Sequence, residues 1–231
     1  MSLVPSWRFP RWRRTSDPRN EAVSTGEASS LCSPANVSGE IEPGVPTYCS
    51  VIFVGFQTEL MPLVHGAQKA TDVAQVLAGA AQAAGVRAVA LEIDQTTWGP
   101  TIACVRHRCD SIVEQPDLCT FDGRFLDSLC AGRAAPERFV LAGCEDHTWL
   151  LQAALLAMGR GHEACVVQEA CISRGMQDAA NAEQVLRETG GTFVSATDVV
   201  HGWCRYKENQ ELNALLQLVK RTAAGGSNGW R

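Results

Sequence analysis

Short apolar runs of strand length alternate with longer helix-like segments between residues 48 and 200, and this alternation constrains the fold more than any other feature. The run at 50–56 (SVIFVGF) is apolar throughout, as in a strand covered on both faces. The segment 67–84 is rich in alanine and is followed by Gly85, a residue typical of helix ends. Strands that alternate with such helices form parallel βαβ units. The pattern therefore predicts a doubly wound, three-layer α/β fold with a mostly parallel six-stranded sheet and helices on both faces.

The alternation continues along the rest of this region. Further strands are predicted at 86–93, 111–114, 138–142, 164–169 and 192–195, and further helices at 123–132, 148–158 and 178–188. On this basis residues 47–200 are interpreted as one α/β domain.

Two segments flank this domain. Residues 1–46 are rich in Pro, Ser, Gly and Arg without periodic hydrophobicity, so we expect an extended N-terminal arm there. The first 20 residues carry a net charge of +4, a composition typical of a mitochondrial transit segment, and a disordered basic tail is the alternative. Residues 201–231 are expected to form a linker at 201–206, a helix at 208–221 and a flexible tail. The predicted helix carries an apolar stripe, Leu212, Leu215, Leu216 and Val219, whose spacing favours packing on its own domain over a partner surface.

Composition and charge argue against several classes of protein. Hydrophobic residues make up 45% of the 231 residues and charged residues 19%, so the chain can bury a substantial core. The net charge of −5 argues against a general nucleic-acid binder. No apolar run approaches the roughly 20 residues that cross a bilayer, which argues against a membrane-spanning segment.

Ten cysteines are spread along the chain and include no Cys-x-x-Cys pair. They are Cys32, Cys49, Cys104, Cys109, Cys119, Cys130, Cys144, Cys165, Cys171 and Cys204. A chain of this size folds without disulfides, so we expect most of these side chains to be reduced and buried. Cys104, His107 and Cys109 could supply part of a zinc site, but their spacing is unusual and no second cysteine pair follows, so we expect no metal there.

The C-terminal half of the domain carries a series of motifs in a fixed order. It contains FVLAG at 139–143, CEDHTWLLQAALLAMGRGH at 144–162, EACVVQEAC at 163–171 and GGTFVSATDVV at 190–200. The N-terminal half contributes an apolar strand that leads to Gln57. Taken together, residues 48–200 resemble the isochorismatase-like cysteine hydrolase superfamily.

Members of that superfamily hydrolyse C–N or vinyl-ether bonds with an aspartate, a lysine and a cysteine. The resemblance implies that these positions are Gly55, Gln115 and Trp149 in this chain. A glycine has no side chain to accept a proton, a glutamine carries no charge, and an indole N–H is not a nucleophile. Some members also bind a metal near the second strand, where Asp94 is followed here by Gln-Thr-Thr without a histidine. The resemblance thus implies a pseudoenzyme that has lost the catalytic triad and holds no metal or other cofactor.

Cys144 and His147 offer an alternative. Both follow the strand predicted at 138–142, at the end of the sheet where doubly wound folds place their sites, and could act as a relocated nucleophile and its base. Neighbouring residues rarely converge on one point, so a buried thiol beside a helix N-terminus is the simpler interpretation.

An emptied triad with added terminal segments is typical of a structural or accessory subunit of a larger assembly. Proteins that resemble this superfamily occur as accessory subunits of protist mitochondrial assemblies, the ATP synthase among them. The resemblance predicts other protein subunits as partners, in a complex that can be membrane-associated. The arginine-rich start predicts a mitochondrial location, with the cytoplasm as the alternative. No nucleic-acid partner is expected, because the net charge is −5. The alternatives are a divergent cysteine hydrolase that uses Cys144 and His147, and a small-molecule binder without chemistry.

Overall fold

The computed structural model describes residues 49–116, 124–130, 137–144, 146–207 and 209–224. The expected N-terminal arm at 1–46 and the last residues of the expected tail, 225–231, lie outside these ranges.

The core of the domain is a six-stranded sheet in the order β3-β2-β1-β4-β5-β6. Its strands are β1 (Cys49–Val54), β2 (Arg87–Ile93), β3 (Ser111–Gln115), β4 (Arg138–Cys144), β5 (Glu163–Ile172) and β6 (Thr192–Val194). Every neighbouring pair runs parallel, so the predicted parallel α/β sheet is confirmed. From β1 the chain adds β2 and then β3 on one side of the sheet. It then crosses to the other side of β1 and adds β4, β5 and β6 there. The strand order therefore reverses between the neighbouring strands β1 and β4.

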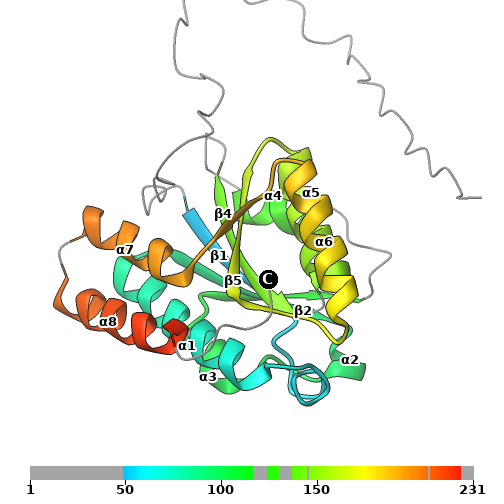
Figure 1. Ribbon diagram of the computed structural model, residues 1–231, viewed down its shortest axis with the longest axis horizontal. Coiled ribbons are helices and arrows are strands. Elements are labelled where there is room, and N and C mark those ends of the chain that lie inside the picture. Colours follow the sequence, from blue (N-terminus) through cyan, green and yellow to red (C-terminus); the bar gives the residue numbers. More distant parts are fainter. Residues whose placement is uncertain (1–48, 117–123, 131–136, 145, 208, 225–231) are drawn as a thin grey trace, which may run out of the picture. The chain divides into compact units, whose positions relative to one another are not determined.

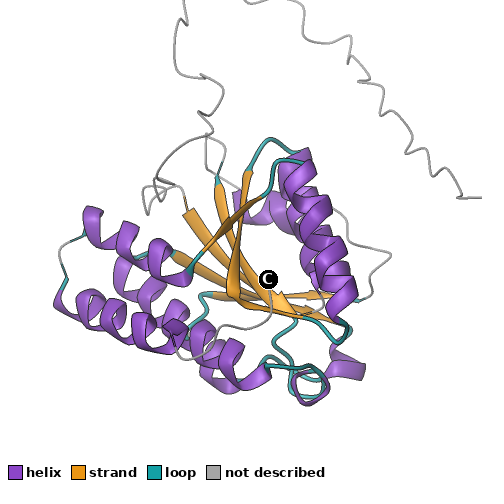
Figure 2. Ribbon diagram, in the orientation of Figure 1, coloured by secondary structure: helices purple, strands orange, loops and turns teal. Residues whose placement is uncertain are grey.

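Helices cover both faces of this sheet, as the sequence predicted (Figures 1 and 2). They are α1 (Ala67–Ala84), α2 (Gln95–Trp98), α3 (Ala103–Arg106), α4 (Arg124–Cys130), α5 (Leu151–Gly159), α6 (Met176–Glu188), α7 (Ala196–Tyr206) and α8 (Gln210–Ala224), with a 3-10 turn at Met61–Leu63 and a π-helical turn, η3, at Asp146–Leu150. Figure 1 shows α1, α7 and α8 on one face and α5 and α6 on the other. Among the described residues, no helix has the length and apolar character needed to cross a bilayer.

The linker predicted at 201–206 is wrong, because these residues are the second half of helix α7. The Ser195 hydroxyl accepts a hydrogen bond from the backbone N–H of Asp198 (3.0 Å) and so caps the first turn. Val199, Val200 and Trp203 then lie on one buried face of the helix. The spacing of these apolar residues and the Ser-x-x-Asp start are helix signals within the sequence, and the strand expected just before them hid the boundary.

Helix α8 packs on its own chain through the apolar stripe that the sequence singled out. Leu212, Leu216 and Val219 are buried, and α8 lies against α1 and α7. Helix α1 consists largely of alanines and has Gly79 in its middle, so a neighbouring helix can approach closely. A Cβ atom added to Gly79 would lie 3.7 Å from the Leu215 Cδ1 atom, which shows how near α8 comes. The described residues between 49 and 224 therefore belong to one compact unit.

Strands β4 and β1 lie so close together at Gly143 that one added methyl group should destabilise the protein. A Cβ atom added at Gly143 would lie 2.3 Å from the Val54 carbonyl oxygen and 2.9 Å from the Val54 Cβ atom. We expect Gly143→Ala to lower the free energy of unfolding by about 1–3 kcal/mol, since the strand backbones must separate to admit it. Urea unfolding measures this change.

Gly159→Ala is the matched control. Nothing lies within 4 Å of the corresponding Cβ position at the end of α5, so this change should be neutral or should stabilise by about 0.5–1 kcal/mol. Equal losses in the two variants would contradict the close approach of the two strands.

Candidate functional site at the carboxyl ends of the strands

Two of the three positions that the resemblance assigns to the catalytic triad lie where the strand order reverses between β1 and β4. Gly55 follows β1, and Trp149 lies in the turn η3 that follows β4. Doubly wound folds bind ligands in the crevice outside the carboxyl ends at such a point. The third residue, Gln115, ends β3 two strands away from β1.

The ring of Trp149 lies directly on Gly55. A Cβ atom at Gly55 would come within 2.9 Å of the Trp149 Cε3 atom and 3.1 Å of its Cζ3 atom. Gly55 also has a φ of +66°, in the left-handed region that glycine occupies without strain. Trp98 packs edge-on against the same indole with ring centroids 6.0 Å apart. An aromatic side chain that is only 4% exposed therefore fills the space beside the end of β1.

Packing alone holds this tryptophan in place. Its indole N–H is buried and has no hydrogen-bond partner. A buried donor without a partner costs about 1–3 kcal/mol, which the apolar contacts of the large ring must offset.

The fallback nucleophile, Cys144, is fully buried at the end of β4. Its thiol donates a hydrogen bond to the Met61 sulfur, 3.3 Å away. His147 belongs to the turn η3, but its side chain lies outside the described residues. The described geometry therefore places the Cys144 sulfur inside the apolar core, away from solvent.

Gln115 and Asp94 join the ends of β3 and β2. The Asp94 backbone N–H donates to the Gln115 carbonyl (2.8 Å), and Gln115 is buried. The Asp94 carboxylate accepts hydrogen bonds from the Thr96 hydroxyl (2.6 Å) and the Thr97 backbone N–H (3.3 Å). These bonds, that of Thr96 first, hold the pKa of Asp94 below its usual value. Asp94 is thus the N-cap of α2.

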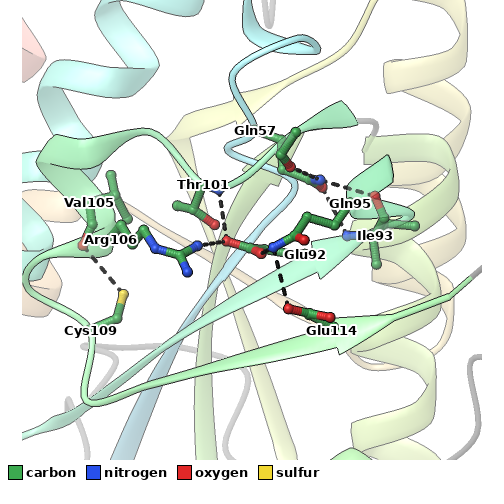
Figure 3. Close-up of polar contacts among 10 residues, drawn as sticks. Gln57, Glu92, Ile93, Gln95, Thr101, Val105, Arg106, Cys109 and Glu114 are labelled. Carbon is green, nitrogen blue, oxygen red and sulfur yellow. Dashed lines mark hydrogen bonds and ion pairs between the residues drawn. The ribbon is translucent and has the colours of Figure 1, made fainter. Parts of the chain in front are cut away.

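Glu92, which the sequence reading did not single out, is a fully buried carboxylate near the end of β2. It accepts hydrogen bonds from the backbone N–H of Thr101 (2.7 Å) and the Gln95 amide (2.7 Å), and it forms an ion pair with Arg106 (Figure 3). The Gln95 amide also reaches Glu114 on β3 (3.3 Å). A charged residue inside the apolar run at 86–93 was the signal that could have pointed to this network.

Two opposing effects set the pKa of Glu92: its burial, and its hydrogen bonds together with the charge of Arg106. Burial is the largest influence and tends to raise the pKa of this carboxyl group. The hydrogen bonds from Thr101 and Gln95 and the charge of Arg106 together outweigh it, so the pKa lies below its usual value. The carboxylate is charged in the folded protein and anchors the α2–α3 segment to the sheet.

Gln57 fastens the other side of the same segment. Its amide donates to the carbonyls of Ile93 (3.0 Å) and Gly99 (2.7 Å) and accepts from the Ile93 N–H (2.9 Å). Gln57 is fully buried, and Figure 3 shows it beside Ile93. These bonds use both sides of the amide, so Gln57 acts as a structural clamp between the exit of β1 and the end of β2.

Cys109, one of the three residues considered above for a zinc site, has another partner in the structure. The Cys109 thiol donates to the Val105 carbonyl (3.4 Å), one turn back along the chain. Burial raises the pKa of Cys109 to about 12, which disfavours the thiolate that zinc requires. Within the described residues, no three His, Cys, Asp or Glu side chains gather as a metal site would need.

The Glu92 network predicts a stability that depends on pH. A carboxyl group with a lowered pKa in the folded state stabilises the protein above its unfolded pKa, and this contribution is lost as the pH falls through the folded pKa. We expect Glu92→Gln to lower the free energy of unfolding at pH 7 by about 1–3 kcal/mol, and the difference from the wild type to shrink near pH 3. Urea unfolding at both pH values checks this.

Glu114→Gln serves as the control, since Glu114 is exposed and touches the network only through the longer Gln95 bond. A loss in Glu92→Gln that is the same at pH 7 and pH 3 would contradict the role assigned to the charge.

No family model and no curated protein sequence matches the chain. Solved structures do. A MAR1 ribonuclease from Caenorhabditis elegans matches with a TM-score of 0.67 at 17% identity, over 79% of this chain and 93% of that one. YcaC from Pseudomonas aeruginosa matches with a TM-score of 0.68 at 16% identity, over 81% of this chain and 96% of that one.

A third structure carries the family name. It is an isochorismatase family protein from Burkholderia thailandensis, which matches with a TM-score of 0.62 at 15% identity, over 71% of this chain and 99% of that one. Identities at this level establish a shared architecture. The chain therefore has the isochorismatase-like α/β fold.

Proposed function

We propose that this chain is a non-catalytic isochorismatase-like protein that serves as a structural or accessory subunit of a larger assembly. The observation that carries the proposal is the indole of Trp149, which lies buried against Gly55 at the end of β1. A substrate needs that space at the point where strand order reverses. With the space filled, the fold keeps its architecture and loses its natural binding site.

The replacements at Gly55 and Trp149 depend on each other. Any side chain at Gly55 would collide with the Trp149 ring, whose Cε3 atom would lie 2.9 Å from the added Cβ atom. An aspartate at this position is therefore incompatible with the tryptophan. The two changes support a site that was remodelled as a unit, with the tryptophan filling the volume that the side chain and the substrate would need.

The remaining chemistry also supports this proposal. Gln115 is buried and carries no charge that could stabilise a developing negative charge. The Cys144 thiol is fully buried beside Met61, where a thiolate would be desolvated and costly. A divergent cysteine hydrolase that uses Cys144 and His147 is the competing proposal, and the thiol-labelling experiment below separates the two.

The proposed assembly is mitochondrial, and the ATP synthase is the first complex to test. The arginine-rich composition of the first 20 residues supports the location. The choice of complex is supported by the occurrence of proteins that resemble this superfamily as accessory subunits of protist mitochondrial assemblies.

We expect the native protein to migrate with other subunits in a large complex. Native electrophoresis of a source extract, followed by mass spectrometry of the co-migrating proteins, measures this. Migration as a monomer or small homo-oligomer would contradict the assembly role and return attention to Cys144.

A double-mutant cycle tests whether Trp149 fills the space above Gly55. Gly55→Ala should lower the free energy of unfolding by about 2–4 kcal/mol, from backbone strain plus overlap with the indole. In a Trp149→Ala background, the same change should cost only the strain, about 1–2 kcal/mol. Urea unfolding of the four proteins gives the coupling, and additive losses would contradict direct contact between the two positions.

Thiol labelling tests the competing hydrolase. We expect Cys144 to resist iodoacetamide at neutral pH in the native protein and to react after denaturation, because it is buried. Peptide mapping by mass spectrometry locates the label. Selective labelling of native Cys144, together with turnover of an amide substrate that Cys144→Ala abolishes, would establish the hydrolase and overturn the non-catalytic proposal.

A further inference from the structure

The cysteines of this domain differ strongly in their surroundings. Of the eight in the described residues, four are buried and four are half-buried. Burial raises the pKa of Cys49 to about 12 and that of Cys165 to about 11, and it also raises the pKa of Cys109 and Cys204. Such thiols react slowly at neutral pH. The other two half-buried cysteines are Cys104 and Cys130.

Cys130 has a histidine as its neighbour. It ends α4, and its sulfur lies 3.6 Å from the Nε2 atom of His162, which immediately precedes β5. The His162 ring packs edge-on against Phe139, with ring centroids 5.2 Å apart. This pair lies at the amino ends of the strands, at the opposite end of the sheet from Trp149.

The hydrogen bonds of His162 decide its tautomer. Its Nδ1 atom accepts a hydrogen bond from the backbone N–H of Glu137 (3.1 Å), so Nδ1 carries no hydrogen in the neutral ring. The ring hydrogen is then on Nε2, which faces the Cys130 sulfur. A protonated Nε2 can neither take a proton from the thiol nor ligate a metal. It can donate a hydrogen bond to the sulfur, and this bond strengthens when the sulfur becomes a thiolate.

We propose that Cys130 is a redox modification site that exchanges with small soluble disulfides, such as oxidised glutathione. The Cys130 thiol releases its proton to solvent, and the thiolate attacks one sulfur of the disulfide. A new bond forms between Cys130 and that sulfur while the original disulfide bond breaks, and the second thiol leaves as a thiolate. The His162 N–H stabilises the attacking thiolate. The site is independent of the crevice at Trp149 and of the proposed assembly role.

The test uses the full-length chain and oxidised glutathione as the probe, with peptide mapping of the modified cysteines over time. Among the eight cysteines that the structure describes, Cys130 should be modified first, and Cys104 provides the reference rate within the same molecule. In His162→Phe, which keeps a ring against Phe139 but lacks the N–H, modification of Cys130 should slow roughly tenfold while that of Cys104 is unchanged.

His162→Gln is the rescuing variant. A glutamine amide can accept from the Glu137 N–H and donate toward the sulfur, so the rate at Cys130 should stay within about threefold of the wild type. Circular dichroism confirms that each variant is folded before labelling. Earlier modification of Cys104 or Cys204 than of Cys130, or an unchanged rate at Cys130 in His162→Phe, would overturn the proposal.

Discussion

The packing of the Trp149 indole on Gly55 is the contact on which the carboxyl end of the sheet depends. It sits where the strand order reverses between β1 and β4, which is the position that a doubly wound sheet offers for binding. The ring can reach this position only because residue 55 lacks a side chain and adopts a positive φ. Trp98 packs against the same ring. A large, close-packed aromatic group in this place is part of the buried core.

The surroundings of this contact are held by polar groups that act structurally. Gln57 clamps the exit of β1 to the end of β2, and Glu92 anchors the α2–α3 segment through Thr101, Gln95 and Arg106 (Figure 3). Buried amides and carboxylates with a full set of partners rigidify a structure. The polar network at the carboxyl ends of the strands therefore stabilises the fold. At the amino ends of the strands, Cys130 meets His162, and we propose a redox modification site there.

Much of the fold could be predicted because each βαβ unit has a local signature. The run at 50–56 and the alanine-rich helix α1 are recognisable from apolar patterning alone. Helix α7 was missed because its first residues directly follow a short strand, and the helical spacing of Val199, Val200 and Trp203 competes with that strand signal. Glu92 was missed because its partners at Gln95, Thr101 and Arg106 converge only after two short helices have formed, and no periodicity encodes such helices.

The sequence by itself determined the parallel α/β architecture, the positions of the strands and the residue types at the crevice, because these depend on local patterning and on order along the chain. Only the tertiary structure decided what those residues do together. That Trp149 lies on Gly55, that Cys144 is buried against Met61 and that His162 turns its Nε2 toward Cys130 all involve segments between 32 and 94 residues apart in the chain. Contacts of this kind arise from close packing across strands and helices, and packing is a property of the folded chain as a whole.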